Sequence, residues 1–354
     1  MYKMIVKKSL SALLIATMVC GAAFAGNTDR AGQAGAGELL INPWARSAGW
    51  GGVNTGGVAG LEATFLNIAG MAHTKKTELS FANTNWLKGS DITINAFGLA
   101  QKVGESGVLG LIVSSMNFGD IEITTTESPE GGIGTYNPQF VNVGLAYART
   151  FSNRIYGGLL VRAVSEGFST VKASGVCFDA GIQYVTGFNE AKDNLRFGIS
   201  LRNVGTSIKF DGDGLSSRFT VLPQNYTLAV QQRAERFELP SLLHIGATYD
   251  FNPAENHDLT AAANFTSNSF SNDEYGIGLQ YGFKKMFMVR AGYIAESSAF
   301  DSDEEDANVH SGFTAGATVE IPLGKSDKRL GIDYAFRASD PFDNTHTIGA
   351  ILKL

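Results

Sequence analysis

The chain has 354 residues, of which 42 are glycine and only 8 are proline, and charged residues make up 18% of it. The formal net charge of −6 gives no basic surface, which argues against nucleic-acid binding. Low charge combined with 23 Phe and 11 Tyr suits strands that face lipid on one side. A soluble, secreted β-rich protein is the alternative that composition leaves open.

The first 25 residues have the features of a secretory signal peptide. Lysines lie at the start, an apolar stretch runs from Leu10 to Cys20, and Ala23-Phe24-Ala25 is a small-x-small cleavage site. We therefore expect residues 1–25 to be removed by cleavage after Ala25. This leaves Cys177 as the lone cysteine, so we expect no internal disulfide.

Residues 26–76 differ from the rest of the chain, because they are dense in glycine and lack strand alternation. Trp44, Trp50, Phe65 and Leu66 favour burial. A segment of this kind at the head of a barrel can fold into the lumen as a hatch, or it can remain a loose periplasmic tail. The large apolar side chains favour the hatch.

From residue 77 onward, large apolar residues occupy alternate positions. In the stretch Tyr275–Phe283 they share one face, and glycine and glutamine occupy the other. Segments of roughly ten residues suit tilted strands that cross a bilayer. We expect an all-β fold, a transmembrane antiparallel β-barrel at 77–354, with polar residues such as Arg290 and Asp333 facing the lumen. About fourteen strands are predicted, at 77–87, 92–103, 107–118, 138–150, 154–166, 173–186, 194–205, 240–251, 256–267, 274–284, 287–297, 309–322, 328–338 and 345–354.

The connections alternate between short turns and long loops. The three longest, 119–137, 206–239 and 298–308, follow odd-numbered strands and so lie at the same end of the barrel. Long loops of outer-membrane barrels lie outside the cell, which predicts that both termini are periplasmic. The last strand alternates up to Leu354 and resembles the C-terminal assembly signal of such barrels.

The sequence contains no recognisable catalytic or metal-binding motif. The five histidines are scattered, and neither a nucleophile elbow nor a phosphate-binding loop is present. His244 and Ser241 are neighbours in sequence but have no evident orienting acid, and we interpret His244 as a residue of the interfacial girdle. The sequence predicts no enzyme, no metal site and no cofactor.

The loop 206–239 is unusually apolar for an exposed connection. It either packs over the barrel mouth or binds a partner, and both interpretations remain open. If it binds a partner, the contact residues we expect are Phe210, Phe219, Leu222 and Tyr226, together with Tyr136 from the loop 119–137.

Two glycine-rich motifs carry a resemblance. Ala45-Arg46-Ser47-Ala48-Gly49-Trp50-Gly51-Gly52 and Leu66-Asn67-Ile68-Ala69-Gly70-Met71-Ala72, followed by a strand ending in Trp86-Leu87, resemble the PorV/PorQ family. These are FadL-like outer-membrane barrels associated with the type IX secretion system of the Bacteroidetes. The resemblance implies fourteen strands and an N-terminal hatch that includes Arg46, Gly51, Gly52, Asn67 and Gly70. The family commonly has Asn-Pro-Ala-Gly where this chain has Asn67-Ile68-Ala69-Gly70, which leaves the geometry of the hatch turn in question.

The resemblance also implies a function. PorV-like members bind the secretion translocon and the C-terminal signal domain of cargo, which they carry to surface attachment proteins. We therefore predict a non-enzymatic outer-membrane protein that contacts such partners, and membrane lipid, through its long loops. The alternative is a FadL-like channel for uptake of hydrophobic small molecules, which needs an apolar pocket beside the hatch.

Overall fold

The computed structural model describes residues 26–187, 193–223, 225–297, 312–324, 327–339 and 342–354. The expected signal peptide 1–25 and the expected loop 298–308 lie outside the described residues.

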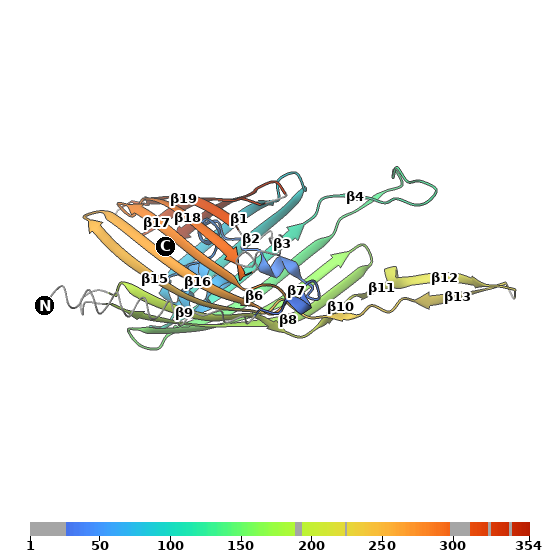
Figure 1. Ribbon diagram of the computed structural model, residues 1–354, viewed down its shortest axis with the longest axis horizontal. Coiled ribbons are helices and arrows are strands. Elements are labelled where there is room, and N and C mark those ends of the chain that lie inside the picture. The colour runs from blue at the N-terminus through green and yellow to red at the C-terminus, as the bar shows by residue number, and fades with distance from the viewer. Residues whose placement is uncertain (1–25, 188–192, 224, 298–311, 325–326, 340–341) are drawn as a thin grey trace.

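Fourteen antiparallel strands form a closed barrel (Figure 1). The strand β1 pairs with both β2 and β21, and β8 pairs with both β7 and β9, so the ring has no free edge. The predicted strands are confirmed, with boundaries shifted by a few residues. The barrel strands are β1 (Thr77–Trp86), β2 (Ile92–Val103), β3 (Gly107–Asn117), β6 (Gln139–Thr150), β7 (Ile155–Phe168), β8 (Val171–Thr186), β9 (Leu195–Gly205), β15 (Leu242–Ala254), β16 (His257–Asn268), β17 (Glu274–Phe283), β18 (Phe287–Glu296), β19 (Gly312–Pro322), β20 (Arg329–Arg337) and β21 (Thr345–Lys353).

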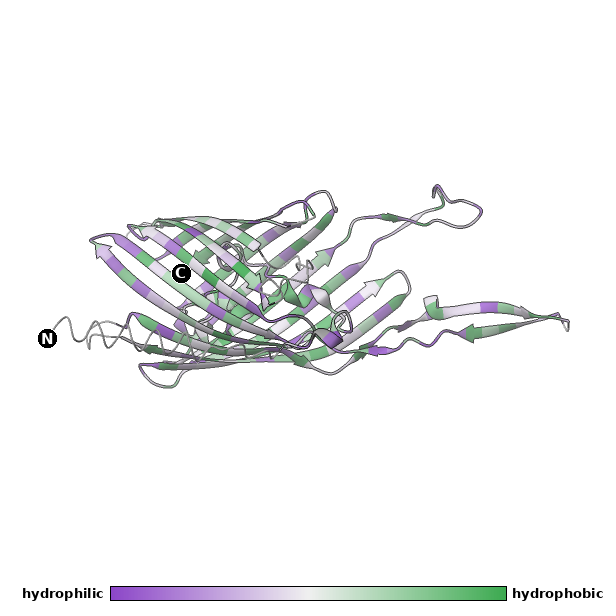
Figure 2. Ribbon diagram, viewed as in Figure 1, coloured by the Kyte–Doolittle hydropathy of each residue, from purple (hydrophilic) through white to green (hydrophobic). Residues whose placement is uncertain are grey.

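The two faces of the barrel strands differ in burial and in polarity. Outward-facing apolar side chains are widely exposed, for example Phe81 at 49%, Leu145 at 66% and Ile277 at 64%. Figure 2 shows hydrophobic and hydrophilic residues alternating along the strands. A belt of apolar side chains this large is suited to hydrocarbon rather than to water. Among the described residues, none of the helices combines the length and hydrophobicity that spanning a membrane requires.

Shorter elements precede and interrupt the barrel. The N-terminal segment holds η1 (Thr28–Arg30), η2 (Gly37–Leu40), α2 (Ala45–Ala48), η3 (Gly60–Glu62), α3 (Ala63–Leu66) and η4 (Ile68–His73). Short strands lie in the long connections: β4 (Ile121–Glu122), β5 (Thr135–Tyr136), β10 (Ile208–Lys209), β11 (Asp211–Gly212), β12 (Ser216–Val221), β13 (Tyr226–Gln231) and β14 (Arg236–Phe237), with η5 (Asp213–Leu215) between β11 and β12. We call the hairpin of β12 and β13 the arm; it projects far beyond the barrel wall (Figure 1).

The two ends of the described chain lie at opposite ends of the barrel. The Asn27 nitrogen donates to the Asn268 oxygen at 3.4 Å, beside the long connections, whereas the Leu354 nitrogen donates to the Thr77 oxygen at 2.9 Å, beside the short turns. The expectation that both termini are periplasmic stays a prediction. The N-terminal segment threads the barrel from the long-loop end to the start of β1, so its first residues are held far from its last.

Candidate functional site

The lumen is lined by glycines against which the N-terminal segment packs. Several face each other across neighbouring strands, as in the pairs Gly158–Gly181, Gly198–Gly246 and Gly278–Gly292. A Cβ atom on Gly292 would lie 2.5 Å from the Trp50 oxygen, so the backbone of the segment touches the wall. Glycine therefore provides the room that the segment occupies, and this explains much of the high glycine content.

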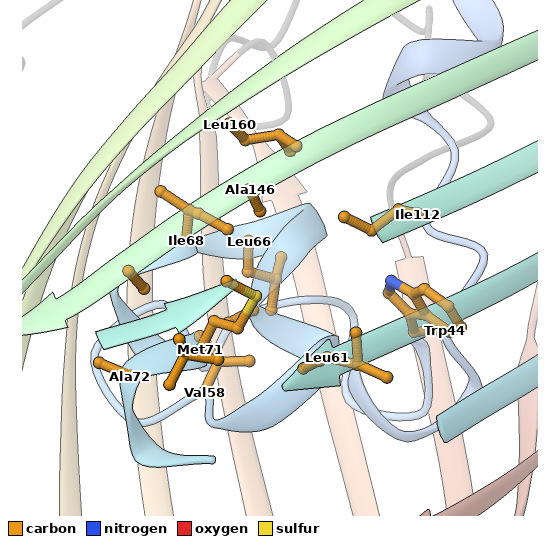
Figure 3. Packing of buried hydrophobic residues seen from close by; sticks show 14 of the residues in the cluster. Trp44, Val58, Leu61, Leu66, Ile68, Met71, Ala72, Ile112, Ala146 and Leu160 are labelled. Atoms are coloured by element: carbon orange, nitrogen blue, oxygen red, sulfur yellow. The ribbon is translucent and has the colours of Figure 1, made fainter. Parts of the chain in front are cut away.

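One side of the N-terminal segment is apolar (Figure 3). Trp44, Leu61 and Met71 are at most 1% exposed, and they pack against Ile112 and Leu160 of the wall. These wall residues belong to β3 and β7, so the apolar contact covers one side of the ring. Burial of this kind stabilises by roughly 1.5–3 kcal/mol for each large side chain.

The opposite side of the segment is held by charge. The Arg46 guanidinium pairs with Glu320 at 2.8 Å and with Asp333 at 3.0 Å. Arg290, whose side chain is fully buried, donates to the Arg46 oxygen at 3.2 Å and lies 4.0 Å from Asp333. Arg290 and Asp333, both expected to face the lumen, thus lie together there, with Arg46 as a third member of the group. Such buried groups are stable only as a complete network.

The other residues expected in the hatch also bind or pack within the lumen. Asn67 is fully buried; its amide donates to the Ile182 oxygen at 3.0 Å and its Oδ1 accepts from the Ala69 nitrogen at 3.2 Å. Gly51 and Gly52 have φ angles of +71° and +72°, which favour glycine. A Cβ atom on Gly70 would collide with the Val58 oxygen. Asn67 caps η4 without the proline that is common in the PorV/PorQ motif.

An apolar cavity of about 40 Å³ lies between the N-terminal segment and the strands β2, β3, β6 and β7. Most of the lining is apolar and includes Trp44, Phe65, Ile94, Met116 and Phe140, whereas Glu38, Ser114, Asn142 and Arg162 are polar members of it. Towards the long-loop end it adjoins a cluster of apolar side chains at the rim, formed by Ile41, Trp86, Ile94 and Met116 with Leu87, Ile92, Phe118 and Phe140 packed against it. Packed apolar side chains therefore continue from the rim to the cavity.

A second cavity of about 60 Å³, whose lining includes both apolar and charged side chains, lies on the other side of Phe65, against β9 and β15 to β18. The Arg202 guanidinium lies 3.8 Å above the Phe65 ring, and its Nη2 donates to the Leu39 oxygen at 3.2 Å. Arg202 Nε and Nη1, His244 Nε2 and Asn264 Oδ1 make no hydrogen bond to the described residues. This cavity can hold water or a polar group of a ligand, and Phe65 separates it from the apolar cavity.

Glu38 of η2 lies near Glu166 of β7, beside the apolar cavity. Burial raises the pKa of Glu38 to about 8, and the Glu166 carboxyl adds to the rise. The Glu38 carboxyl is therefore largely protonated and uncharged at neutral pH.

The five expected partner-contact residues do not form one surface. Phe219 and Tyr226 lie on the same face of the arm, and Leu222 at its tip is 78% exposed. Phe210 packs between Phe168 and Phe237 at the base of the connection. Tyr136 lies on β5 and pairs with Ile121 in a separate hairpin.

The arm is amphipathic. Phe219 faces Leu228 and Val221 faces Tyr226 on one side, whereas Arg218 faces Ala229 and Thr220 faces Thr227 on the other. Phe219 and Leu228 are 57% and 45% exposed. A two-stranded ribbon of this kind has little stability alone, so its apolar side favours a partner.

The pair of Ser241 and His244 has no catalytic geometry. Ser241 donates to Ser269 at 2.9 Å, and His244 Nδ1 lies 2.9 Å from Thr266 Oγ1 inside the barrel. His244 is 6% exposed and faces the lumen, so its interpretation as an interfacial girdle residue was wrong. Within the described ranges, no group of three potential His, Cys, Asp or Glu ligands comes together.

The fold is shared with channels for hydrophobic molecules. The toluene transporter TodX of Pseudomonas putida is 11% identical over 88% of this chain and 97% of that one, with a TM-score of 0.57. The monoaromatic hydrocarbon channel CymD is 14% identical over 88% of this chain and 97% of that one, with a TM-score of 0.52. A TodX deletion mutant, described as a monoaromatic hydrocarbon channel, has 14% identity over 87% of this chain and 97% of that one, and a TM-score of 0.55.

No protein-family model matches the sequence. No curated protein matches it in sequence either. The structural likenesses show the fold alone, a closed antiparallel β-barrel like those of TodX and CymD. The resemblance to PorV/PorQ and to type IX secretion stays a prediction.

Proposed function

We propose that this protein is a channel for uptake of small hydrophobic molecules, with the N-terminal segment as its hatch and the long-loop end outside the cell. The observation that carries the proposal is the continuous packing of apolar side chains from the rim to the apolar cavity. The fold shared with TodX and CymD supports it. The substrates for which those two proteins are named, toluene and monoaromatic hydrocarbons, suggest a compact aromatic ligand.

The cavities hold only a few water molecules, so a ligand of this size passes when the hatch moves. The charged contacts of Arg46 hold one side of the hatch firmly. On the apolar side, no ion pair joins the described part of the segment to β2, β3, β6 or β7, and Phe65 there lies between the two cavities. We therefore place the ligand path on the side of β2, β3, β6 and β7.

Filling the apolar cavity tests this function. Ser114 lines the cavity, whereas its neighbour Val113 lies on the opposite face of β3, towards lipid. We expect Ser114→Trp to lower the initial rate of labelled toluene uptake about tenfold in cells, a change of about 1.4 kcal/mol. Val113→Trp is the matched control and should leave uptake unchanged. Equal rates in the two variants, at equal barrel yield, would exclude this path.

A second candidate function rests on the arm. We propose that its apolar face binds a protein partner, for which the PorV/PorQ resemblance suggests a type IX translocon or the C-terminal domain of its cargo. Phe219→Ser with Leu228→Ser removes this face, and Arg218→Ser with Thr220→Ser alters the opposite face as a control. If the first pair of changes leaves co-purification of the partner intact, the arm is not the contact surface.

A further inference from the structure

The apolar cavity beside Phe65 has a polar patch on the barrel wall, formed by Asn142 of β6 and Arg162 of β7. Each of these two residues is 8% exposed, and both line the cavity. Within the part of the chain that the structure describes, Asn142 Oδ1 and Arg162 Nε make no hydrogen bond. Leaving a buried polar atom without a partner is costly, so the two atoms favour an occupant of the cavity that satisfies both.

The sheet register brings the two side chains of the polar patch to the same part of the wall. Arg162 pairs with Gly144 across β6 and β7, two residues from Asn142, so Asn142 and Arg162 are diagonal neighbours on the lumen face. A Cβ atom on Gly144 would lie 3.0 Å from Arg162 Cγ, which places the arginine stem over this glycine. Ser114 of β3 lies directly opposite Asn142 on its other side. One hydrogen-bond donor and one acceptor are therefore presented to the cavity together.

The Arg162 guanidinium is fixed in place and its charge is already paired. Its Nη2 donates to Asp179 Oδ2 and, at 2.7 Å, to Asn203 Oδ1. Because Asp179 neutralises the guanidinium, Arg162 Nε is better suited to a neutral oxygen than to a second carboxylate. Glu38, the other ionisable residue of the lining, interacts with Glu166. The polar patch therefore favours an uncharged ligand group that both donates and accepts.

We infer that this polar patch binds the hydroxyl group of a neutral phenol or aromatic alcohol with a single ring. The hydroxyl donates to Asn142 Oδ1 and its oxygen accepts from Arg162 Nε, so one group satisfies both atoms. The ring packs against apolar wall residues of the same cavity, Ile112, Met116 and Phe140. All five residues belong to barrel strands, so the site remains when the hatch moves to admit the ring. This inference rests on the proposed function, because it names the substrate class of that cavity.

Toluene and p-cresol are matched probes, because they differ by one hydroxyl group and a phenol is neutral at pH 7. In cells, we expect the native protein to take up labelled p-cresol at least about tenfold faster than labelled toluene at equal concentration, a difference of about 1.4 kcal/mol. Asn142→Leu removes the acceptor at similar size, and should slow p-cresol uptake about tenfold while leaving toluene uptake unchanged. Val143→Leu, on the lipid-facing side of the same strand, should keep the preference.

Binding is also measured without transport, on the purified protein in detergent. The rise of the thermal unfolding midpoint with ligand concentration should give a dissociation constant at least about tenfold lower for p-cresol than for toluene. Asn142→Leu should remove this difference; if that variant does not fold, the two probes on the native protein decide the matter. Equal affinities for the two probes, or no response because the cavity holds only water, would overturn the inference. A preserved difference in affinity without uptake of either probe would refute the channel and leave the site standing.

Discussion

The N-terminal segment and the arm both carry large apolar residues outside regular barrel strands, yet the structure uses them in opposite ways. Trp44 and Leu61 are buried against the wall, whereas Phe219 and Leu228 of the arm are about half exposed. The difference lies in the surroundings, because glycines in the lumen make room for the segment and nothing in the described chain covers the arm's apolar side. Burial is decided by the available space and not by composition.

The largest loss of stability is expected from removing a charged partner of Arg46 and Arg290. Asp333→Ala leaves the buried Arg290 and the neighbouring Arg46 without this partner, which should cost about 3–5 kcal/mol. The measurement is the urea midpoint of unfolding in detergent. Asp250→Ala removes the partner of Arg196, an ion pair with side chains 25% and 31% exposed, and should cost about 1 kcal/mol or less. If Asp333→Ala and Asp250→Ala destabilise the protein equally, the lumen is as well solvated as the rim.

A smaller loss of stability is expected when a lumen glycine that contacts the N-terminal segment is replaced by a larger residue. Gly292→Ala places a Cβ atom 2.5 Å from the Trp50 oxygen, and this overpacking should cost about 1–3 kcal/mol. Gly282→Ala is the control, since its Cβ atom would meet its nearest neighbour at 3.6 Å, an ordinary contact. Protease sensitivity of the segment should rise in the first variant only. A stable and protected Gly292→Ala protein would contradict the close fit.

The contribution of the Glu38 carboxyl to the stability of the folded protein should depend on pH. Its pKa rises from 4.5 to about 8 in the folded protein, so its contribution to stability is fully present below pH 4.5 and is lost as pH rises through 8. Glu38→Gln should flatten the decline of the unfolding midpoint between pH 4.5 and 8. Glu235→Gln, at an exposed position, should follow the native curve. Parallel curves for the native protein and Glu38→Gln would exclude this carboxyl as the cause.

The smallest effect on stability is expected in the arm. Phe219→Ser and Leu228→Ser together should change the unfolding free energy of the barrel by less than about 0.5 kcal/mol, because these side chains are exposed and remote from the ring. The heat-induced mobility shift in an SDS gel measures this. A loss comparable to that of Gly292→Ala would mean that the arm folds back onto the barrel.

The sequence predicted the barrel itself closely, for a physical reason. A strand that faces lipid on one side and the lumen on the other must alternate in polarity, and this alternation is local in the sequence. The strand β2 was therefore predicted with both of its boundaries correct, Ile92 and Val103. The pairing of Arg290 with Asp333 was also within reach, since both residues were assigned to the polar face.

The candidate site was predicted only in part. The motif residues Arg46 and Asn67 were identified through the resemblance, but their partners Glu320 and Ile182 lie more than a hundred residues away and carry no local signal. Glu38 was missed because an isolated carboxylate in a glycine-rich segment resembles a solvated residue. Alternate glycines on inward faces were the available signal for a filled lumen, and they were interpreted only as a pattern of strands.

The sequence by itself determined which side of each strand meets hydrocarbon and where the chain turns, because both follow from neighbouring residues. The tertiary structure alone decided that the N-terminal segment enters at the long-loop end, that Phe65 lies between two cavities, and that Gly26 lies beside Asp273. These features depend on closure of the ring, which brings together side chains that no local pattern relates.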